Sequence, residues 1–144
     1  MQKIRLICAW LLVVVLLALA GLHVYWALGG TWAKSATLPT IGGRRTIHPS
    51  RFITFVVAGL LVLGAATISG RAGLFATGSW APLFEFGAWL LFVAFLLRTI
   101  GNLRTFGFFK TVHGSTFSFW DTRLYTPLCA VLAVLVAIVA SGSE

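Results

Sequence analysis

The sequence predicts an all-α integral membrane protein, folded as an antiparallel bundle of four helices. Three observations predict this fold class: 59% of the residues are hydrophobic, only eleven Lys or Arg and three Asp or Glu are present, and the chain contains four long apolar runs. A soluble domain carries about a quarter charged residues, so this chain has too few to cover a surface in water. The composition therefore excludes a soluble enzyme, a disordered tail and a disulfide scaffold, and the length fits one domain, residues 1–144.

The four apolar runs are residues 7–28, 52–68, 82–100 and 124–140, which hold 22, 17, 19 and 17 residues. At about 1.5 Å per residue, helices of these lengths reach roughly 25 to 33 Å, which matches a hydrocarbon core of about 30 Å. The backbone finds no water in that core, so each run must be helical despite its valines and isoleucines. Short connections then make neighbouring helices antiparallel.

The first run has features of a signal peptide as well as of a retained helix. Residues 1–5 are basic, and Ala18-Leu19-Ala20 resembles a signal-peptidase site. The apolar stretch continues through Trp26 to Leu28, which makes it long enough to span. We therefore expect a retained helix, with cleavage as the alternative.

Tryptophan placement supports these helix limits. Trp10, Trp26, Trp80 and Trp120 fall near the predicted helix ends, where amphipathic rings favour the headgroup level of a bilayer. Only Trp89 lies in the middle of a run. We interpret the four terminal rings as an aromatic belt rather than as a ligand cage.

The first and third loops carry turn patterns. Residues 40–47 place Gly42-Gly43 between β-compatible flanks, and residues 109–119 do the same around His113-Gly114. We expect short β-hairpins in both loops, lying against the membrane face. The alternative is that the phenylalanines of the third loop lie in the interface without forming a strand.

The net charge of +8 indicates contact with anionic lipid headgroups. The basic residues are scattered between apolar runs, so the sequence offers no basic face for nucleic acid. Eight of them fall on the side of the first and third loops, seven in the loops and Arg98 near the end of the third run, against Lys3, Arg5 and Arg71 on the side of the termini. The positive-inside rule then favours cytoplasmic loops and outside termini, although the basic N-terminus of the first helix favours the opposite orientation.

The two cysteines give no argument for redox chemistry or metal binding. Cys8 and Cys129 form no CxxC pair and have no metal-ligand spacing. Both lie in apolar runs, where a free thiol behaves as a small hydrophobe. We expect no cofactor and no metal.

Because four successive helices cross the membrane in alternating directions, many of the polar and ionisable residues of the chain fall at one membrane face. The end of the first helix, the end of the third and the start of the fourth all lie there. The candidate residues for ligand binding, or for a structural latch, are His23, Tyr25, Trp26, Arg98, Asn102, Asp121, Arg123 and Tyr125.

His23 is the most informative of these residues, because it lies roughly 8 Å inside the predicted end of the first helix. An ionisable group at membrane depth usually faces protein or a water-filled cavity and is a functional-site candidate. The structural interpretation, which we favour, is an imidazole hydrogen-bonded to a neighbouring helix.

Arg98 has three possible roles. Its side chain can extend to the headgroups, or share a helix face with Asn102 and hold a phosphate or carboxylate. We favour the third, an ion pair with Asp121, because the pair neutralises both groups near a region of low dielectric constant. We also expect Asp121 to be the N-cap of the fourth helix, and Pro127 to kink that helix.

Glu85 stands apart, near the start of the third helix at the opposite face. A single acid in a span can bind a proton or a cation. It lies three residues after Pro82, so an interaction with the helix dipole is the better explanation.

The chain resembles a family of small bacterial membrane proteins described only as a domain of unknown function. The resemblance rests on His23-Val24-Tyr25-Trp26-Ala27-Leu28-Gly29-Gly30, Arg98-Thr99-Ile100-Gly101-Asn102, Phe108-Phe109-Lys110 and Asp121-Thr122-Arg123-Leu124-Tyr125-Thr126-Pro127-Leu128-Cys129, with Thr126 where serine is expected. It implies a four-helix protein of the bacterial cytoplasmic membrane, and no activity, substrate or cofactor.

Three functions are compatible with the sequence. The first is a protein that binds lipid or a lipophilic ligand, or an accessory subunit of a membrane complex, with membrane lipids, a membrane protein or further copies of the chain as partners. The second is a small intramembrane enzyme for a lipophilic substrate, with His23 as acid or base. The third, ranked last, is a minimal transporter that uses Glu85.

Overall fold

The computed structural model confirms the helical fold; it describes residues 1–33, 38, 40–41, 44–45, 49–101, 107–111 and 114–142. Within these residues, four helical segments are long and apolar enough to cross a membrane. The elements are α1 (Gln2–Ala27), β1 (Thr40–Ile41), β2 (Arg44–Arg45), α3 (Arg51–Arg71), η1 (Gly78–Trp80), α4 (Ala81–Ile100), α5 (Thr116–Trp120), η2 (Asp121–Tyr125) and α6 (Thr126–Ser141).

Helix α1 begins at Gln2, so the basic N-terminal residues belong to the helix. It ends at two glycines. Gly29 has a φ of 105°, its N–H donates to the Trp26 carbonyl, and the Gly30 N–H donates to the Tyr25 carbonyl. These two bonds form a Schellman motif, which requires a left-handed residue at Gly29. A Cβ at Gly30 would lie 2.3 Å from the Tyr25 ring, so both glycines are needed to turn the chain here.

Helix α3 extends beyond its predicted limits at both ends. Ser50 caps its N-terminus, with Oγ accepting from the Ile53 N–H at 3.2 Å. At the other end Arg71 remains helical although its side chain is buried. Its guanidinium donates to the carbonyls of Ala140 and Gly142, so it ties the end of α3 to the end of α6.

The fourth span begins at Thr116, eight residues before its predicted start. Ser115 is its N-cap, with Oγ accepting from the Ser118 N–H at 3.0 Å. The helix therefore occupies residues 116–119, and the predicted third-loop hairpin is wrong there; His113 lies outside the described residues. The prediction of Asp121 as N-cap is also wrong, because Ser115 supplies that cap six residues earlier.

A π-helical turn, η2, joins α5 to α6. Pro127 follows it by two residues, and proline has no N–H and clashes with the carbonyl four residues before it. The Thr126 N–H donates instead to the Asp121 carbonyl, five residues back. The wider turn lets the span continue past the proline, and π turns are frequent at functional sites.

In the first loop, β1 and β2 pair as antiparallel strands of only two residues each. Thr40 lies opposite Arg45, and Ile41 opposite Arg44. Gly42 and Gly43, on which the hairpin prediction depended, lie outside the described residues.

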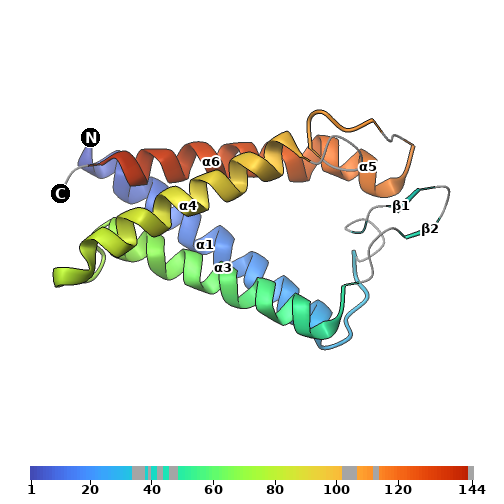
Figure 1. The fold of residues 1–144 in the computed structure, drawn as a ribbon, viewed down its shortest axis with the longest axis horizontal. Coiled ribbons are helices and arrows are strands. Elements are labelled where there is room, and N and C mark those ends of the chain that lie inside the picture. Colours follow the sequence, from blue (N-terminus) through green and yellow to red (C-terminus); the bar gives the residue numbers. More distant parts are fainter. Residues whose placement is uncertain are drawn as a thin grey trace.

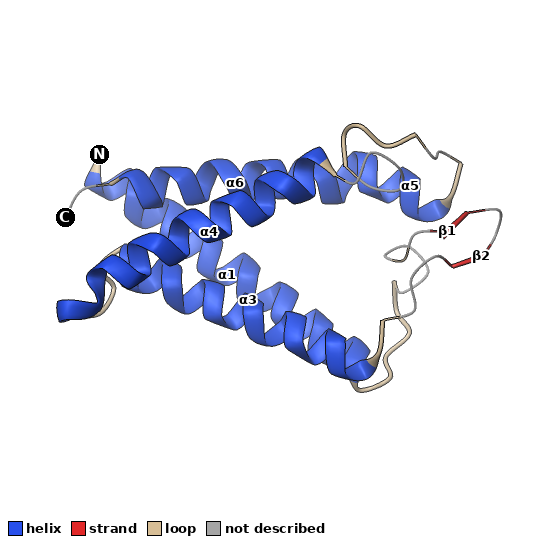
Figure 2. Cartoon of the chain, in the orientation of Figure 1, coloured by secondary structure: helices blue, strands red, loops and turns tan. Residues whose placement is uncertain are grey.

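The helices form two antiparallel pairs that diverge like the arms of a V. One arm is α1 with α3, and the other is α4 with α6 (Figure 1). The arms meet near the two chain termini and separate toward the first loop and α5 (Figure 2). The buried core lies at the closed end: Cys8, Ala9, Leu12, Leu16, Ala65, Ile68, Ala72, Ala88, Leu132, Val136, Val139 and Ala140.

Small residues permit the close approach of the helices at the closed end. A Cβ at Gly70 would lie 2.4 Å from the Phe84 ring, and one at Gly87 would lie 2.9 Å from Thr67 Cγ2. In lipid the hydrophobic effect does not drive helices together, so their association depends on the close van der Waals packing that small residues permit. The buried core lies at this end, and the arms separate toward the other (Figure 1).

Candidate ligand-binding cavity

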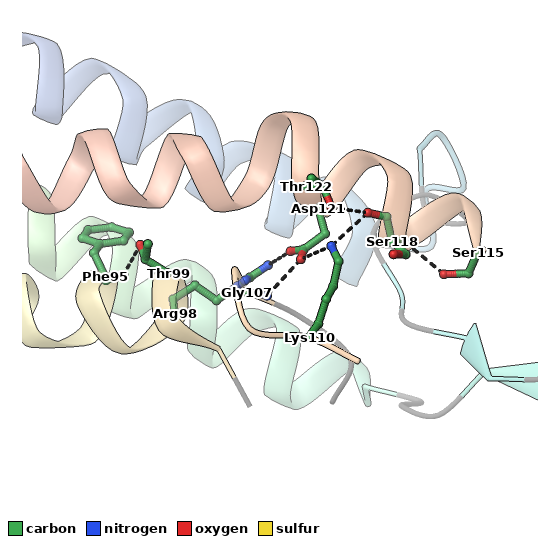
Figure 3. Close-up of polar contacts among 9 residues, drawn as sticks. All are labelled: Phe95, Arg98, Thr99, Gly107, Lys110, Ser115, Ser118, Asp121 and Thr122. Carbon is green, nitrogen blue, oxygen red and sulfur yellow. Dashed lines mark hydrogen bonds and ion pairs between the residues drawn. The ribbon is translucent and has the colours of Figure 1, made fainter. Parts of the chain in front are cut away.

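Asp121 is the centre of a polar cluster at the open end of the α4–α6 arm. Its side chain is fully buried. Oδ1 lies 2.7 Å from the Arg98 guanidinium, and Oδ2 lies 2.8 Å from Lys110 Nζ. Lys110 also donates to the Ser118 carbonyl at 2.9 Å. Figure 3 shows these side chains meeting between α4, the third loop and the α5–η2 segment. The predicted Arg98–Asp121 pair is thus confirmed, and Lys110 is added to it.

The same carboxylate fixes the backbone of the third loop. The Gly107 N–H donates to Asp121 Oδ2 at 2.9 Å, and the Phe108 N–H donates to the Thr99 carbonyl at 2.9 Å. Gly107 has a φ of 91°, and a Cβ there would lie 2.4 Å from Gly101 Cα. Only glycine fits this contact, so the loop returns tightly against the end of α4.

A cavity of about 950 Å³ lies between the two arms. This is the size of a site for a drug-sized or lipid-like molecule. Its lining consists mostly of apolar side chains from both arms: Leu19, Leu22, His23, Trp26, Gly29, Trp32, Ala33, Leu38, Pro49, Arg51, Ile53, Thr54, Val57, Phe95, Arg98, Phe117, Trp120, Leu124, Tyr125, Leu128, Cys129 and Leu132.

The cavity changes in character from its closed end to its mouth. Leu132 lies at its inner end, where it also belongs to the buried core. Trp120 lies toward the mouth, at a helical rise of roughly 18 Å from Leu132. The two lining arginines, Arg51 at the start of α3 and Arg98 near the end of α4, both lie toward the mouth. The cavity therefore has an apolar interior and a basic entrance.

His23 lines this cavity with a defined ring orientation. Its Nδ1 lies 2.8 Å from the Leu19 carbonyl, and its ring makes an edge contact with Trp26 at 5.2 Å between centroids. A carbonyl only accepts, so Nδ1 carries the proton and Nε2 is the nitrogen left for other partners. The bond stays within α1, so the expected hydrogen bond across to a neighbouring helix is not what the described residues show.

Comparison with known proteins assigns the chain to a family. The model of the family described as "Protein of unknown function (DUF3995)" matches residues 6–136. The chain belongs to this family. No curated protein and no solved structure matches it. The expected resemblance to a family of unknown function is thereby confirmed.

In this DUF3995 protein, the residues predicted for the site fall into three groups. His23, Trp26, Arg98 and Tyr125 line the cavity. Asp121 lies behind the lining and holds Arg98.

The third group lies away from the lining. Tyr25 is partly exposed, and its hydroxyl accepts from the Trp32 N–H at 3.4 Å, so it helps to fix the turn after α1. Arg123 is exposed and lies 4.0 Å from the centre of the Phe119 ring. Asn102 lies outside the described residues.

Three polar lining residues of the DUF3995 chain were not among the predicted site residues: Arg51, Thr54 and Cys129. From the sequence, Arg51 is one of the basic residues of the predicted first loop, with no further role indicated. Its place directly before the second apolar run, at the same membrane face as the end of the third run, was the sequence feature that could have indicated a role in the site. For Cys129 no pattern in the sequence distinguishes a cavity-lining thiol from a packed one.

Glu85 lies away from this cavity. It is exposed in the second turn of α4 and lines a smaller hollow of about 530 Å³ with Arg71 and Ser141. That hollow is at the closed end of the bundle, near the termini. The described residues contain no group of three His, Cys, Asp or Glu side chains that could hold a metal ion.

Proposed function

We propose that this protein binds a lipophilic molecule in the cavity between its two arms. The observation that carries the proposal is the cavity itself, with its apolar lining from all four helices and a volume of about 950 Å³. A tightly packed four-helix bundle has no such space, because side chains normally fill the interior to the density of an organic crystal. Here the core occupies only the closed half.

The outer surface of the helices indicates that the cavity lies within a lipid bilayer. Large apolar side chains are exposed along all four helices, for example Leu11, Leu60, Leu90 and Val134, which suits contact with lipid tails. We place the protein in the bacterial cytoplasmic membrane with both termini outside. The eight basic residues on the side of the first and third loops support that orientation. The cavity mouth then opens toward the cytoplasmic leaflet.

Cys129 provides a direct test of occupancy, because its thiol lines the cavity while Cys8 is buried in the core. In the Cys8→Ala variant, reconstituted in lipid nanodiscs, N-ethylmaleimide labels Cys129. Saturating dodecanol, used as a simple alkyl probe, is expected to slow this labelling several-fold.

The matched control moves the thiol along the same helix. Cys129→Ala combined with Ser141→Cys, in the same Cys8→Ala background, places it at the exposed C-terminal end of α6, outside the cavity lining and at the level of water. Dodecanol should not protect that thiol beyond its general dilution of the bilayer. Equal protection at positions 129 and 141, or no protection at either, would contradict the proposal.

A second candidate, a small intramembrane enzyme, is favoured by one observation: His23 lines the cavity with Nδ1 held by Leu19. This arrangement leaves Nε2 to exchange a proton. The His23→Gln variant separates the two functions. A binding protein should purify with the same molecule in both forms, whereas an enzyme should retain a molecule of different mass when His23 is replaced.

A further inference from the structure

We propose that the molecule bound between the arms carries a phosphate-class anionic headgroup, held at the cavity mouth between Arg51 and Arg98. This inference rests on the proposed binding function and adds the chemistry of the ligand. It follows from the charges around the mouth and from the arms that supply them.

The described residues at the mouth carry an excess of positive charge. The protein has only three acidic side chains. Glu85 lines the hollow at the closed end, and Glu144 is the last residue. Of the acidic side chains that the structure describes, Asp121 alone lies near the mouth, where it is shared between Arg98 and Lys110. That cluster therefore keeps a net charge of about +1 by the standard ionisation states.

Arg51 adds a second positive charge from the opposite arm. It lines the cavity at the start of α3, and its side chain has no ion pair or hydrogen bond with any residue that the structure describes. Its guanidinium lies near Gly29, where a Cβ would be 3.8 Å from one of its nitrogens. Arg51 is thus available to an incoming anion.

The asymmetry between the two arginines defines the site. Asp121 fixes Arg98 in place, so that arginine is a preorganised part of the wall. Arg51 is free to close on the ligand from the other arm. A headgroup that contacts both would bridge the arms at the end where they separate.

The charge of the site favours phosphate over carboxylate. A phosphate monoester carries about −1.5 to −2 at neutral pH, which matches a mouth with two excess positive charges, whereas a carboxylate neutralises only one. Guanidinium groups pair in a bidentate manner with phosphate and with carboxylate oxygens alike, so the charge of the headgroup makes the distinction. A headgroup without charge would leave Arg51 unpaired.

The test measures protection of Cys129 from N-ethylmaleimide by three probes with the same twelve-carbon chain. These are dodecyl phosphate, dodecanoate and dodecanol, used with the Cys8→Ala protein in nanodiscs. We expect half-protection at a concentration of dodecyl phosphate about tenfold below that of dodecanol, with dodecanoate between them; tenfold corresponds to one charge-assisted hydrogen bond.

Two substitutions at the same membrane face locate the effect. Arg51→Gln should remove most of the advantage of dodecyl phosphate, and Arg51→Lys should restore part of it. Arg123→Gln removes the same charge from an exposed arginine outside the cavity lining, so it should leave the advantage within about twofold.

The outcomes distinguish failure of the phosphate site from failure of the proposed lipophilic binding function. Equal protection by the three probes would overturn the phosphate site while leaving a lipophilic cavity. An equal loss in Arg51→Gln and Arg123→Gln would also overturn it, since general attraction of anions to the surface would then explain the preference. Failure of all three probes to protect Cys129 would instead contradict the proposed binding function.

Discussion

Asp121 shows how a single residue organises the open end of this molecule. Its buried carboxylate accepts hydrogen bonds from an arginine, a lysine and a backbone N–H. In a region of low dielectric constant, such a charge is tolerated because several donors satisfy it together. The same contacts orient Arg98 at the cavity wall and hold the third loop against α4. Structural support and site geometry therefore depend on the same side chain.

Replacing Asp121 with Asn should strongly destabilise the protein. The substitution leaves the buried Lys110 ammonium and the Arg98 guanidinium without their counter-charge, and breaking a buried pair costs about 3–5 kcal/mol. The measurement is the apparent melting temperature in detergent. Arg123→Gln is the control, expected to cost about 1 kcal/mol or less because its contact with Phe119 is exposed. Equal melting temperatures for the two variants would show that the cluster is not structural.

Gly107 should tolerate alanine far less well than Gly114. Both have a φ near 90°, so both substitutions carry the strain of a left-handed residue, about 1–2 kcal/mol. Only at Gly107 would the new Cβ also collide with backbone, whereas nothing lies within 4 Å at Gly114. We expect Gly107→Ala to lower the melting temperature clearly more than Gly114→Ala. Similar losses at the two positions would contradict the close contact with Gly101.

At the scale of residues, the sequence predicted one ion pair of the site and missed the other contacts. The Arg98–Asp121 pair was predictable because Asp121 is the only acid at that face. The contributions of Lys110 and Gly107 were not, because they depend on the path of the third loop back to α4, which no residue spacing specifies. Arg51 was missed for a related reason: whether a terminal arginine faces lipid headgroups or a cavity depends on how the arms diverge.

At the scale of elements, the four apolar runs predicted the helices, and local chemistry shifted their ends. A length near 20 residues and the need to satisfy the backbone in lipid leave only helices as solutions. The helix ends differ from the predicted ones where a polar side chain makes a hydrogen bond that extends the helix. Arg71 extends α3 because the end of α6 offers carbonyl acceptors. Ser115 moves the start of the fourth span into the third loop, where alternating apolar residues predicted a strand.

A pair of neighbouring leucines on α1 tests which face of a helix holds the bundle together. Leu12 is fully buried in the core, whereas Leu11 is 52% exposed. Leu12→Ala should cost about 2 kcal/mol or more through the cavity that it leaves. Leu11→Ala exchanges one lipid-facing side chain for another and should change the melting temperature little. A larger effect at Leu11 would mean that α1 is rotated from the orientation described.

At the scale of the whole molecule, the division between a packed half and an open half is the feature most relevant to function. The core, the small residues and Arg71 join the helices near the termini. The other half separates into two arms, each stabilised by its own helix pair, and the space between them forms the cavity. Composition and run lengths predicted four helices, but they carry no information on whether the bundle closes along its full length.

The most direct measurement is native mass spectrometry of the protein purified in mild detergent, comparing wild type with Cys129→Phe and Val131→Phe. The first variant places a ring in the cavity, and the second places the same ring on the exposed face of α6. We predict that wild type and Val131→Phe carry one bound amphiphile of the same mass, and that Cys129→Phe has lost it. A bare wild-type chain, or retention of the amphiphile in Cys129→Phe, would contradict a ligand site between the arms.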